Sequence, residues 1–236
     1  MSSSSHERLR ARFHPRHRYA VGALLAIATL GCSSTLVERA IDARGGPLDG
    51  YVRKVDATAL ARMPGEWTWE IAFRYPETFR WTLETWGESQ TISFDGKVAE
   101  HRLGGSVLPP TPGSVPAARS QARWLAVTAL DVLRDEKRLE WHEIPSAELP
   151  GGVRAGIRAV YRDDGASYEL FFDEEDLLVR ARGPIDLSPL GAGSFDAVFG
   201  EFRHVDEYRL PWTGTYSFEG EPFFNERVRG WYPHTF

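Results

Sequence analysis

Residues 66–75 read EWTWEIAFRY, and this stretch decides the fold class. Large apolar side chains alternate with smaller or polar ones along it: Trp67, Trp69, Ile71, Phe73 and Tyr75 against Thr68, Glu70, Ala72 and Arg74. A period of two places all the large side chains on one face of a β-strand, which indicates a half-buried antiparallel strand. Pro76 ends the segment, and Phe79, Trp81 and Leu83 then repeat the pattern. We therefore expect two neighbouring strands with bulky apolar inner faces.

The same alternation continues along most of the chain. Asp95-Gly96-Lys97 is a hairpin signal between two such segments. Further candidate strand segments lie at 51–61, 90–94, 98–103, 139–144, 153–161, 168–172, 177–181, 195–203, 205–210 together with 213–218, and 223–231. These segments predict a mainly β, α+β fold built on a single curved antiparallel sheet of about ten to eleven strands. No repeat or low-complexity linker divides residues 35–236, so we expect one domain there.

Two segments change to a helical period. Residues 35–44 place Leu36, Val37, Ala40 and Ile41 on one stripe, and Gly45-Gly46-Pro47 follows as a stop signal. Residues 104–116 read as a long Gly/Pro loop, after which 117–133 return to helix with Leu125 and Leu130 on the apolar side. A large sheet needs a cover for its apolar face, and these two helices are the candidates.

The N-terminus differs in kind from the rest of the chain. Five arginines precede an uncharged run, Tyr19–Leu30, which is followed by Gly31 and then by the only cysteine, Cys32. A basic head, a short apolar run and a small residue are typical of a secretory signal peptide, whereas a spanning helix needs about 20 apolar residues. We therefore expect residues 1–31 to be a signal peptide. A chain with one cysteine forms no intramolecular disulfide, so packing must stabilise the domain.

Ala28-Thr29-Leu30-Gly31-Cys32 resembles the bacterial lipobox, although Thr29 stands where that motif usually has leucine. The resemblance implies that Cys32 is lipidated and becomes the first residue of the mature chain, with 32–34 as a short tether. Ser33 in place of aspartate implies a cell-envelope protein anchored in the outer membrane and facing the periplasm. The alternative is a secreted protein without a lipid.

Charge and motifs argue against other classes of protein. Removal of residues 1–31, which hold five Arg and one Glu, leaves 23 basic and 32 acidic residues from 28 and 33, a net charge of −9. Nucleic-acid partners need a basic patch, so we expect none. His101, His142, His204 and His234 share no metal-binding spacing, and no nucleophile elbow or phosphate loop occurs. We expect no metal, no cofactor and no enzymatic activity. The acidic turns at 163–164 and 173–176 are typical of solvated surface.

The order of elements resembles the LolA/LolB-like group of periplasmic lipoprotein carriers and receptors. The likeness covers nearly all of residues 35–232: a helix after the signal, the Gly-Gly step, the aromatic strands, the FDG turn at Phe94-Asp95-Gly96, the middle helix, SYELFFDEEDLLVRAR, and FRHVDEYRLPWTGTYSF. The resemblance implies a half-open β-barrel lidded by helices, with an apolar cavity that takes up acyl chains. It also implies other envelope lipoproteins as partners, and a role in moving lipids or lipoproteins to the outer membrane.

The residues expected to line that cavity are Trp67, Trp69, Ile71, Phe73, Phe79, Trp81, Leu83, Leu125 and Leu130. Periodicity identifies burial and not emptiness, so these side chains could equally fill a solid core. In that case the protein would be a structural or protein-binding envelope lipoprotein. The receptor branch of the family has a projecting apolar loop, for which Trp86 or the pair Val107-Leu108 are the candidates here.

Overall fold

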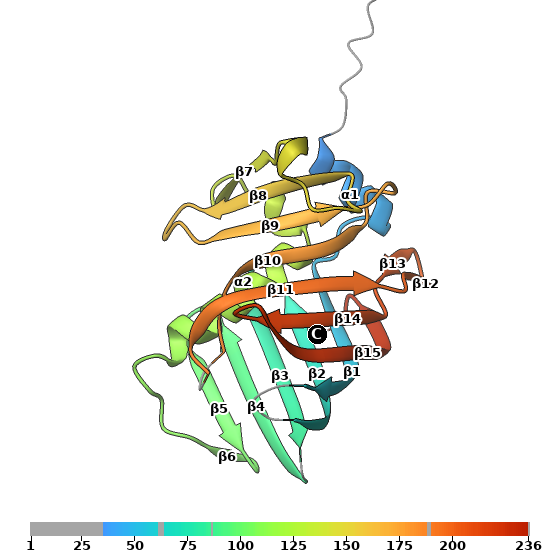
Figure 1. Ribbon diagram of the computed structural model, residues 1–236. Helices are drawn as coiled ribbons and strands as arrows, with labels where there is room; N and C mark the ends of the chain where they lie inside the picture. Colours follow the sequence, from blue (N-terminus) through green and yellow to red (C-terminus); the bar gives the residue numbers. More distant parts are fainter. Residues whose placement is uncertain (1–34, 61–63, 86, 188–189, 236) are drawn as a thin grey trace, which may run out of the picture. The chain divides into compact units, whose positions relative to one another are not determined.

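Antiparallel strands dominate the computed structural model, which describes residues 35–60, 64–85, 87–187 and 190–235. The segment expected to be a signal peptide (residues 1–31), Cys32 and Trp86 lie outside these ranges. Thirteen strands form one sheet in the order β6-β5-β4-β3-β2-β1-β15-β14-β11-β10-β9-β8-β7 (Figure 1). Their bounds are β1 Gly50–Ala59, β2 Gly65–Arg74, β3 Thr78–Thr85, β4 Glu88–Asp95, β5 Ala99–Leu103, β6 Ser106–Val107, β7 Leu139–Glu143, β8 Ala155–Tyr161, β9 Ser167–Phe172, β10 Leu178–Asp186, β11 Ala192–Gly200, β14 Thr213–Phe218 and β15 Glu221–Pro233.

The expected number of strands was wrong, although the fold class is confirmed. The Gly/Pro segment conceals the two-residue edge strand β6, which is too short to show a period of two. The segment predicted at 205–210 does not extend the large sheet. Its residues belong to β12 (Arg203–Val205) and β13 (Tyr208–Leu210), which form a separate two-stranded ribbon. The large sheet is not closed, because β6 and β7 remain as its two edges.

The first and last strands meet in the middle of the sheet. β1 pairs with β2 on one side and with β15 on the other, so residues at opposite ends of the domain are neighbours. The 66–75 segment behaves as its pattern predicts. Trp67, Trp69, Ile71 and Phe73 are all at most 6% exposed, whereas Thr68 and Glu70 face partly outward.

Helix α1 (Leu36–Arg44) begins and ends at strong local signals. The Thr35 hydroxyl accepts from the Glu38 N–H (3.2 Å) and the Glu38 carboxylate accepts from the Thr35 N–H (3.0 Å), a capping box. Gly45 follows with a left-handed φ of 111°, which glycine adopts without strain. The helix was predicted at this position, and it packs against β13.

Helix α2 runs from Ser114 to Thr128, earlier at both ends than the predicted 117–133. Pro116 is compatible with the first turn because the N–H groups there have no partner inside the helix. Leu130 takes a left-handed φ of 66° and directly precedes the 3-10 helix η1 (Asp131–Arg134). Leu130 therefore does not belong to the apolar stripe of α2 on which it was expected. A second 3-10 turn, η2, covers Ser146–Glu148.

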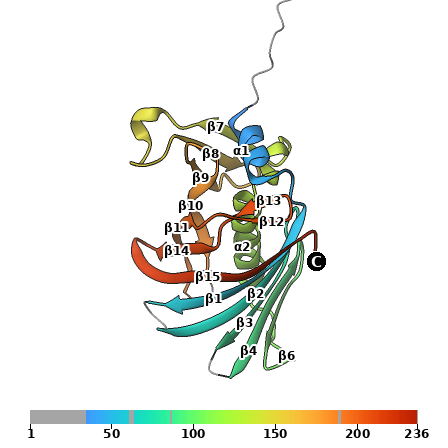
Figure 2. The ribbon, with the colours of Figure 1, turned by 90° about the vertical axis from the view of Figure 1, so that its right-hand side faces the viewer.

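The sheet curves around α2, which lies on its concave side (Figure 2). The helix contacts β10 on one wing of the sheet and β4 and β5 on the other. Small side chains on the buried side of α2 (Ala117, Ala118, Ala122 and Ala126) leave room between the helix and the strands. The interior of the domain is therefore the space between α2 and the concave face.

Candidate functional site

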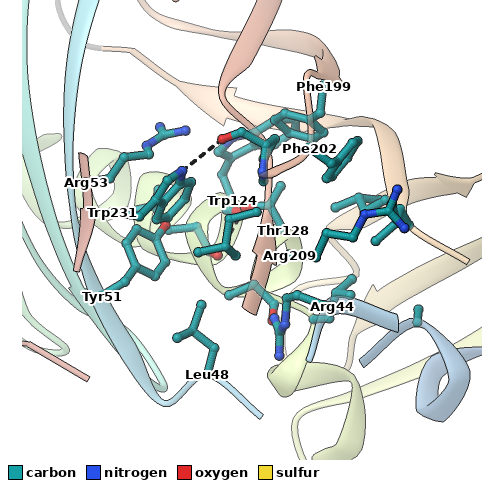
Figure 3. A pocket seen from close by; sticks show the side chains of 18 of the residues that line it. Arg44, Leu48, Tyr51, Arg53, Trp124, Thr128, Phe199, Phe202, Arg209 and Trp231 are labelled. Atoms are coloured by element: carbon teal, nitrogen blue, oxygen red, sulfur yellow. Dashed lines mark hydrogen bonds between the residues drawn. The ribbon is translucent and has the colours of Figure 1, made fainter. Parts of the chain in front are cut away.

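Three adjoining cavities occupy the space between α2 and the concave face of the sheet. The first, of about 70 Å³, lies at the C-terminal end of α2 and is called the helix-end cavity. Figure 3 shows side chains from α1, β1, α2, β11, β13 and β15 around it, with Tyr51, Trp231 and Arg53 next to one another along one wall. Its remaining wall is largely apolar and includes Leu48, Leu125, Leu130, Leu177, Leu178, Phe199 and Phe202.

The second and third cavities extend along the same face toward β3 and β4. The central cavity, of about 70 Å³, and the tryptophan cavity, of about 90 Å³, share Trp69, Trp81, Gln121, Leu187, Phe223 and Phe224. Ile71, Phe79 and Phe195 are among the other residues that line the central cavity, and Trp67, Leu83 and Ile92 are among those that line the tryptophan cavity. The central and helix-end cavities share Arg53, Trp124, Leu125 and Tyr216. The three spaces therefore form one interrupted apolar path.

Aromatic rings separate the cavities. Trp69 meets Phe224 edge to face with ring centroids 5.0 Å apart, and it meets Trp81 in the same way at 5.8 Å. Phe224 stacks on Tyr216 at 4.2 Å. Edge-to-face and offset contacts of this kind stabilise each ring in place.

A bulge in β15 brings two consecutive phenylalanines into this interior. The pairing of β14 with β15 shifts between Tyr216 and Ser217, so that Phe223 is the additional residue. Phe223 and Phe224 are both buried and both line the central and tryptophan cavities. Without the bulge, a period of two would place one of them on the outer face.

One charged pair is buried between the helix-end and central cavities. Arg53 Nη1 donates to Glu226 Oε1 at 2.8 Å, and the Tyr216 hydroxyl donates to the same oxygen at 2.6 Å. Burial would lower the pKa of Arg53, but the Glu226 carboxylate outweighs it and the pKa is raised. Burial, and then the same carboxylate, raise the pKa of Tyr216 well above its ordinary value. The arginine therefore stays charged and the phenol stays neutral.

The structure brings most of the predicted site residues together. Trp67, Trp69, Ile71, Phe79, Trp81, Leu83, Leu125 and Leu130 each line at least one of the three cavities. Phe73 lines none of them; it is fully buried and packs on Tyr51 with ring centroids 5.6 Å apart. Of the predicted membrane-contact residues, Val107 is 55% exposed, Leu108 is half-buried and Trp86 lies outside the described residues.

Sequence reasoning missed the polar members of the site. Arg53 and Glu226 lie at inner-face positions of β1 and β15, and Gln121 lies on the buried side of α2. For Arg53 the sequence did hold a signal of its inner-face position, because it lies two residues from both Tyr51 and Val55, which are on that face. Glu226 had the same signal, because it lies in step with Phe224 and Val228 between the two bulges of β15.

Within the described ranges, no three His, Cys, Asp or Glu side chains gather as metal ligands would. Among the helices described, none has both the length and the apolar character to span a membrane. The expectations that the protein is not an enzyme and binds no metal remain predictions.

Comparisons with known proteins identify the fold. No protein-family model matches the sequence, and no curated protein matches it. Among solved structures, a LolA superfamily protein from Nitrosomonas europaea superimposes with a TM-score of 0.54 at 9% identity, covering 85% of this chain and 93% of the other. A DUF1329 family protein from Desulfovibrio piger superimposes with a TM-score of 0.53 at 9% identity, over 85% and 92%. The likeness is one of fold, and this chain has a LolA-like fold.

Proposed function

We propose that this protein binds a lipid or acyl chain in the apolar path between α2 and the concave face of the sheet. The single observation that supports this best is the set of three adjoining cavities. A solid core would close such spaces, because protein interiors are packed as densely as organic crystals. The LolA-like fold is consistent with this use of the interior, and we propose no catalytic step.

The energetics favour hydrocarbon as the occupant. Each methylene removed from water contributes roughly 0.8 kcal/mol, so a chain of about sixteen carbons gains on the order of 12 kcal/mol before ordering costs. Each cavity alone is smaller than a typical ligand pocket of about 300–1,000 Å³. A bound chain therefore has to pass through more than one cavity, which requires the shared rings of Trp69 and Phe224 to move aside.

Tethering and location complete the proposal. Lipidation of Cys32 would hold the domain at a membrane of the cell envelope, and we propose the outer membrane with the domain facing the periplasm. Trp86, or Val107 with Leu108, would then contact the membrane. Anchoring next to a lipid surface suits a protein that passes acyl chains or lipoproteins between the membrane and other envelope proteins.

The test is uptake of a fluorescent fatty acid by the protein purified without detergent, together with native mass spectrometry for copurified lipid. We expect both signals in the wild type. Leu83→Phe fills the tryptophan cavity and Leu125→Phe fills the space shared by the helix-end and central cavities, and each should weaken uptake at least about tenfold. Leu103→Phe, on exposed β5, is the matched control and should bind as the wild type does.

Absence of copurified lipid together with absence of uptake would overturn the proposal. The protein would then be a structural or protein-binding component of the envelope. The proposal would also fail if uptake persisted unchanged in both cavity-filling variants, because the ligand would then bind elsewhere.

A further inference from the structure

Strand β7 forms one open edge of the large sheet, because it pairs with β8 alone (Figure 1). Two bonds fix which of its backbone groups face β8. The Ile144 N–H donates to the Gly156 carbonyl at 2.8 Å, and the Arg162 N–H donates to the Arg138 carbonyl at 2.9 Å. In an antiparallel ladder the alternate residues direct their backbone groups away from the partner strand. In β7 these outward residues are Leu139, Trp141 and Glu143.

Most of the outward backbone groups of β7 have no hydrogen-bond partner among the described residues. They are the carbonyl of Leu139 and both the N–H and the carbonyl of Trp141 and Glu143. The Leu139 N–H is already paired, since it donates to the Asp135 carbonyl at 3.1 Å. A row of free strand groups at a sheet edge is a template for a further strand.

The opposite edge of the sheet is protected against such pairing, whereas β7 is not. Strand β6 has only two residues and lies between the glycines at 104–105 and the prolines at 109–110. Very short strands, prolines and bulges are the usual means of blocking an edge. Strand β7 has no proline, and its pairing with β8 runs from Leu139 to Glu143 without a bulge. We therefore expect any strand addition at β7.

The side chains of β7 are divided between the two faces of the sheet. Leu139 is buried and Trp141 is half-buried against the core, so both lie on the inner face. Glu140 and His142 are exposed on the outer face, where Glu140 pairs with Arg162 at 3.0 Å. An added strand has to match this division, with an apolar residue opposite Trp141 and complementary polar residues on the outer face.

A second copy of β7 meets both conditions. In an antiparallel pair centred on Trp141, the two Trp141 side chains lie opposite each other on the inner face. On the outer face, Glu140 of each copy lies opposite the partner's His142, whose ring N–H can donate to the carboxylate. The two Trp141 residues exchange backbone bonds, and each Glu143 N–H donates to the partner's Leu139 carbonyl.

Charge favours this register over its two neighbours. A centre moved forward by one residue places His142 opposite the partner's His142, and a centre moved back by one places two Glu140 carboxylates opposite each other. Like charges directly opposite each other destabilise a pair of strands. The backward shift also places the Leu139 N–H at the interface, although Asp135 already accepts from it.

We infer that this protein forms a two-fold symmetric dimer through β7, in which the large sheet continues from one copy into the other. This inference goes beyond the proposed function and does not depend on it, because no residue of β7 lines any of the three cavities. A single pair of short strands is a small interface. Anchoring of both copies in one membrane would raise their effective concentration and strengthen the pairing.

The first test is self-association of the Cys32→Ser protein, measured by sedimentation velocity over a range of concentrations. We expect conversion from monomer to dimer as the concentration rises. Glu143→Pro removes an outward N–H and leaves the bonds to β8 in place, so it should weaken self-association at least about tenfold. Glu143→Ala is the matched control, because it removes the same side chain and keeps the N–H, and it should dimerise as its parent does.

Single cysteines in β7 measure the register, because the Cys32→Ser protein has no other cysteine. Opposite residues of a hydrogen-bonded antiparallel pair have Cα atoms about 5.5 Å apart, within the range of a disulfide. Trp141→Cys should therefore form an intermolecular disulfide on mild oxidation. His142→Cys is the control, since the partner's His142 is displaced by two residues along the strand, beyond the roughly 7 Å that a disulfide can span.

Hydrogen exchange without any substitution in β7 avoids effects of the variants on folding. As the concentration of the Cys32→Ser protein rises, the amide hydrogens of Trp141 and Glu143 should exchange more slowly. Those of Glu140 and His142 should not change, because they already bond to β8. A protein that stays monomeric, with unchanged exchange at Trp141, would overturn the inference, whereas fatty-acid uptake tests the proposed function separately. A disulfide in His142→Cys but not in Trp141→Cys would also contradict the pairing centred on Trp141.

Discussion

At the scale of single residues, Arg53 and Glu226 place two opposite charges inside an otherwise largely apolar interior. They form an ion pair with side chains 10% and 2% exposed, and Trp231 lies beside the guanidinium with its ring centroid 5.3 Å away. Removing one partner of a buried pair leaves an uncompensated charge, which destabilises more than removing both.

We therefore expect Glu226→Gln to lower the free energy of unfolding by about 3 kcal/mol, measured by urea denaturation. The double variant Arg53→Met with Glu226→Gln should recover most of that loss. Asp56→Asn is the control, because its ion pair with Arg229 (3.1 Å) is about half exposed and should be worth less than about 1 kcal/mol. Equal losses in the single and double variants would show that the pair is not coupled.

A second residue-scale prediction concerns the acidic turn between β8 and β9. Asp163 and Asp164 were expected to be solvated, and their side chains are 64% and 53% exposed. Both nevertheless bind Arg123 of α2, which is buried beneath them and 4.3 Å from the centroid of the Tyr161 ring. The turn therefore fastens α2 to one wing of the sheet.

This contact makes stability depend on pH. Partial burial opposes ionisation of Asp164, but the Ala166 N–H (3.0 Å) and Arg123 outweigh it and hold the pKa below the ordinary 3.8. A carboxylate with a lowered pKa contributes stability above its unfolded-state pKa and loses it as the pH falls through the folded value. Asp164→Asn should cost about 1 kcal/mol at pH 7.

In urea denaturation across pH, the difference between Asp164→Asn and the wild type should begin to shrink near pH 4 and should close only when the pH is below the lowered folded-state pKa, where both carry a neutral side chain. Asp206→Asn, in the exposed β12–β13 turn, is the control and should show no such convergence. A difference that stays constant from pH 7 to pH 3 would contradict the role given to Asp164.

The residues of the site were predictable only in part. A period of two identified the tryptophans of β2 and β3, because both strands keep an unbroken register with each other. It did not predict that Phe223 and Phe224 both face the interior, because a bulge in β15 turns these two consecutive side chains to the same side. Gln121 was missed because a single polar residue in an otherwise apolar stripe of a helix gives no sign that it is buried. Phe73 was included because the alternation in β2 cannot distinguish a residue that lines a cavity from one that is packed in the core.

At the scale of elements, the end of α1 fixes how that helix meets the β12–β13 ribbon. Gly45 and Gly46 both have left-handed φ values, 111° and 118°, but only Gly45 lies against the ribbon. A Cβ at Gly45 would overlap the Glu207 backbone carbonyl, whereas a Cβ at Gly46 would meet open space.

We therefore expect Gly45→Ala to lower the free energy of unfolding by more than about 2 kcal/mol, and Gly46→Ala by about 1 kcal/mol through backbone strain alone. Thermal or urea unfolding of the two variants measures the difference. Similar losses at both positions would show that the close approach of Glu207 does not constrain α1.

Element positions followed the sequence where local signals are strong. The capping box at Thr35 and the glycines after Arg44 fixed α1, and Asp95-Gly96 fixed the β4–β5 hairpin. The ends of α2 were displaced because its first turn begins inside the Gly/Pro segment and its last residue is set by the backbone of Leu130. Strand β6 escaped prediction because two residues show no period.

At the scale of the whole molecule, the order of strands places the first and last strands, β1 and β15, at the centre of the sheet. β1 and β15 both border the interior, so any opening of the apolar path involves pairings between residues far apart in sequence. The sequence did not predict this arrangement, since periodicity carries no information on which strands pair.

Anchoring is also a property of the whole molecule. If Cys32 is lipidated, metabolic labelling with an alkyne fatty acid should label the wild-type protein and not Cys32→Ser, and the variant should leave the membrane fraction. Substitution of Ser33 by alanine is the control and should leave the labelling unchanged. Equal labelling of the wild type and Cys32→Ser would place the lipid elsewhere.

The most direct test of acyl-chain binding is a crystal structure with a long-chain ligand brominated near its middle, measured at the bromine absorption edge. Binding along the apolar path predicts an anomalous peak between α2 and the concave face, among Trp69, Trp81 and Phe224, with those rings displaced from their present contacts. A bromine peak outside the sheet, or an interior that stays closed while the ligand is present at saturating concentration, would contradict it.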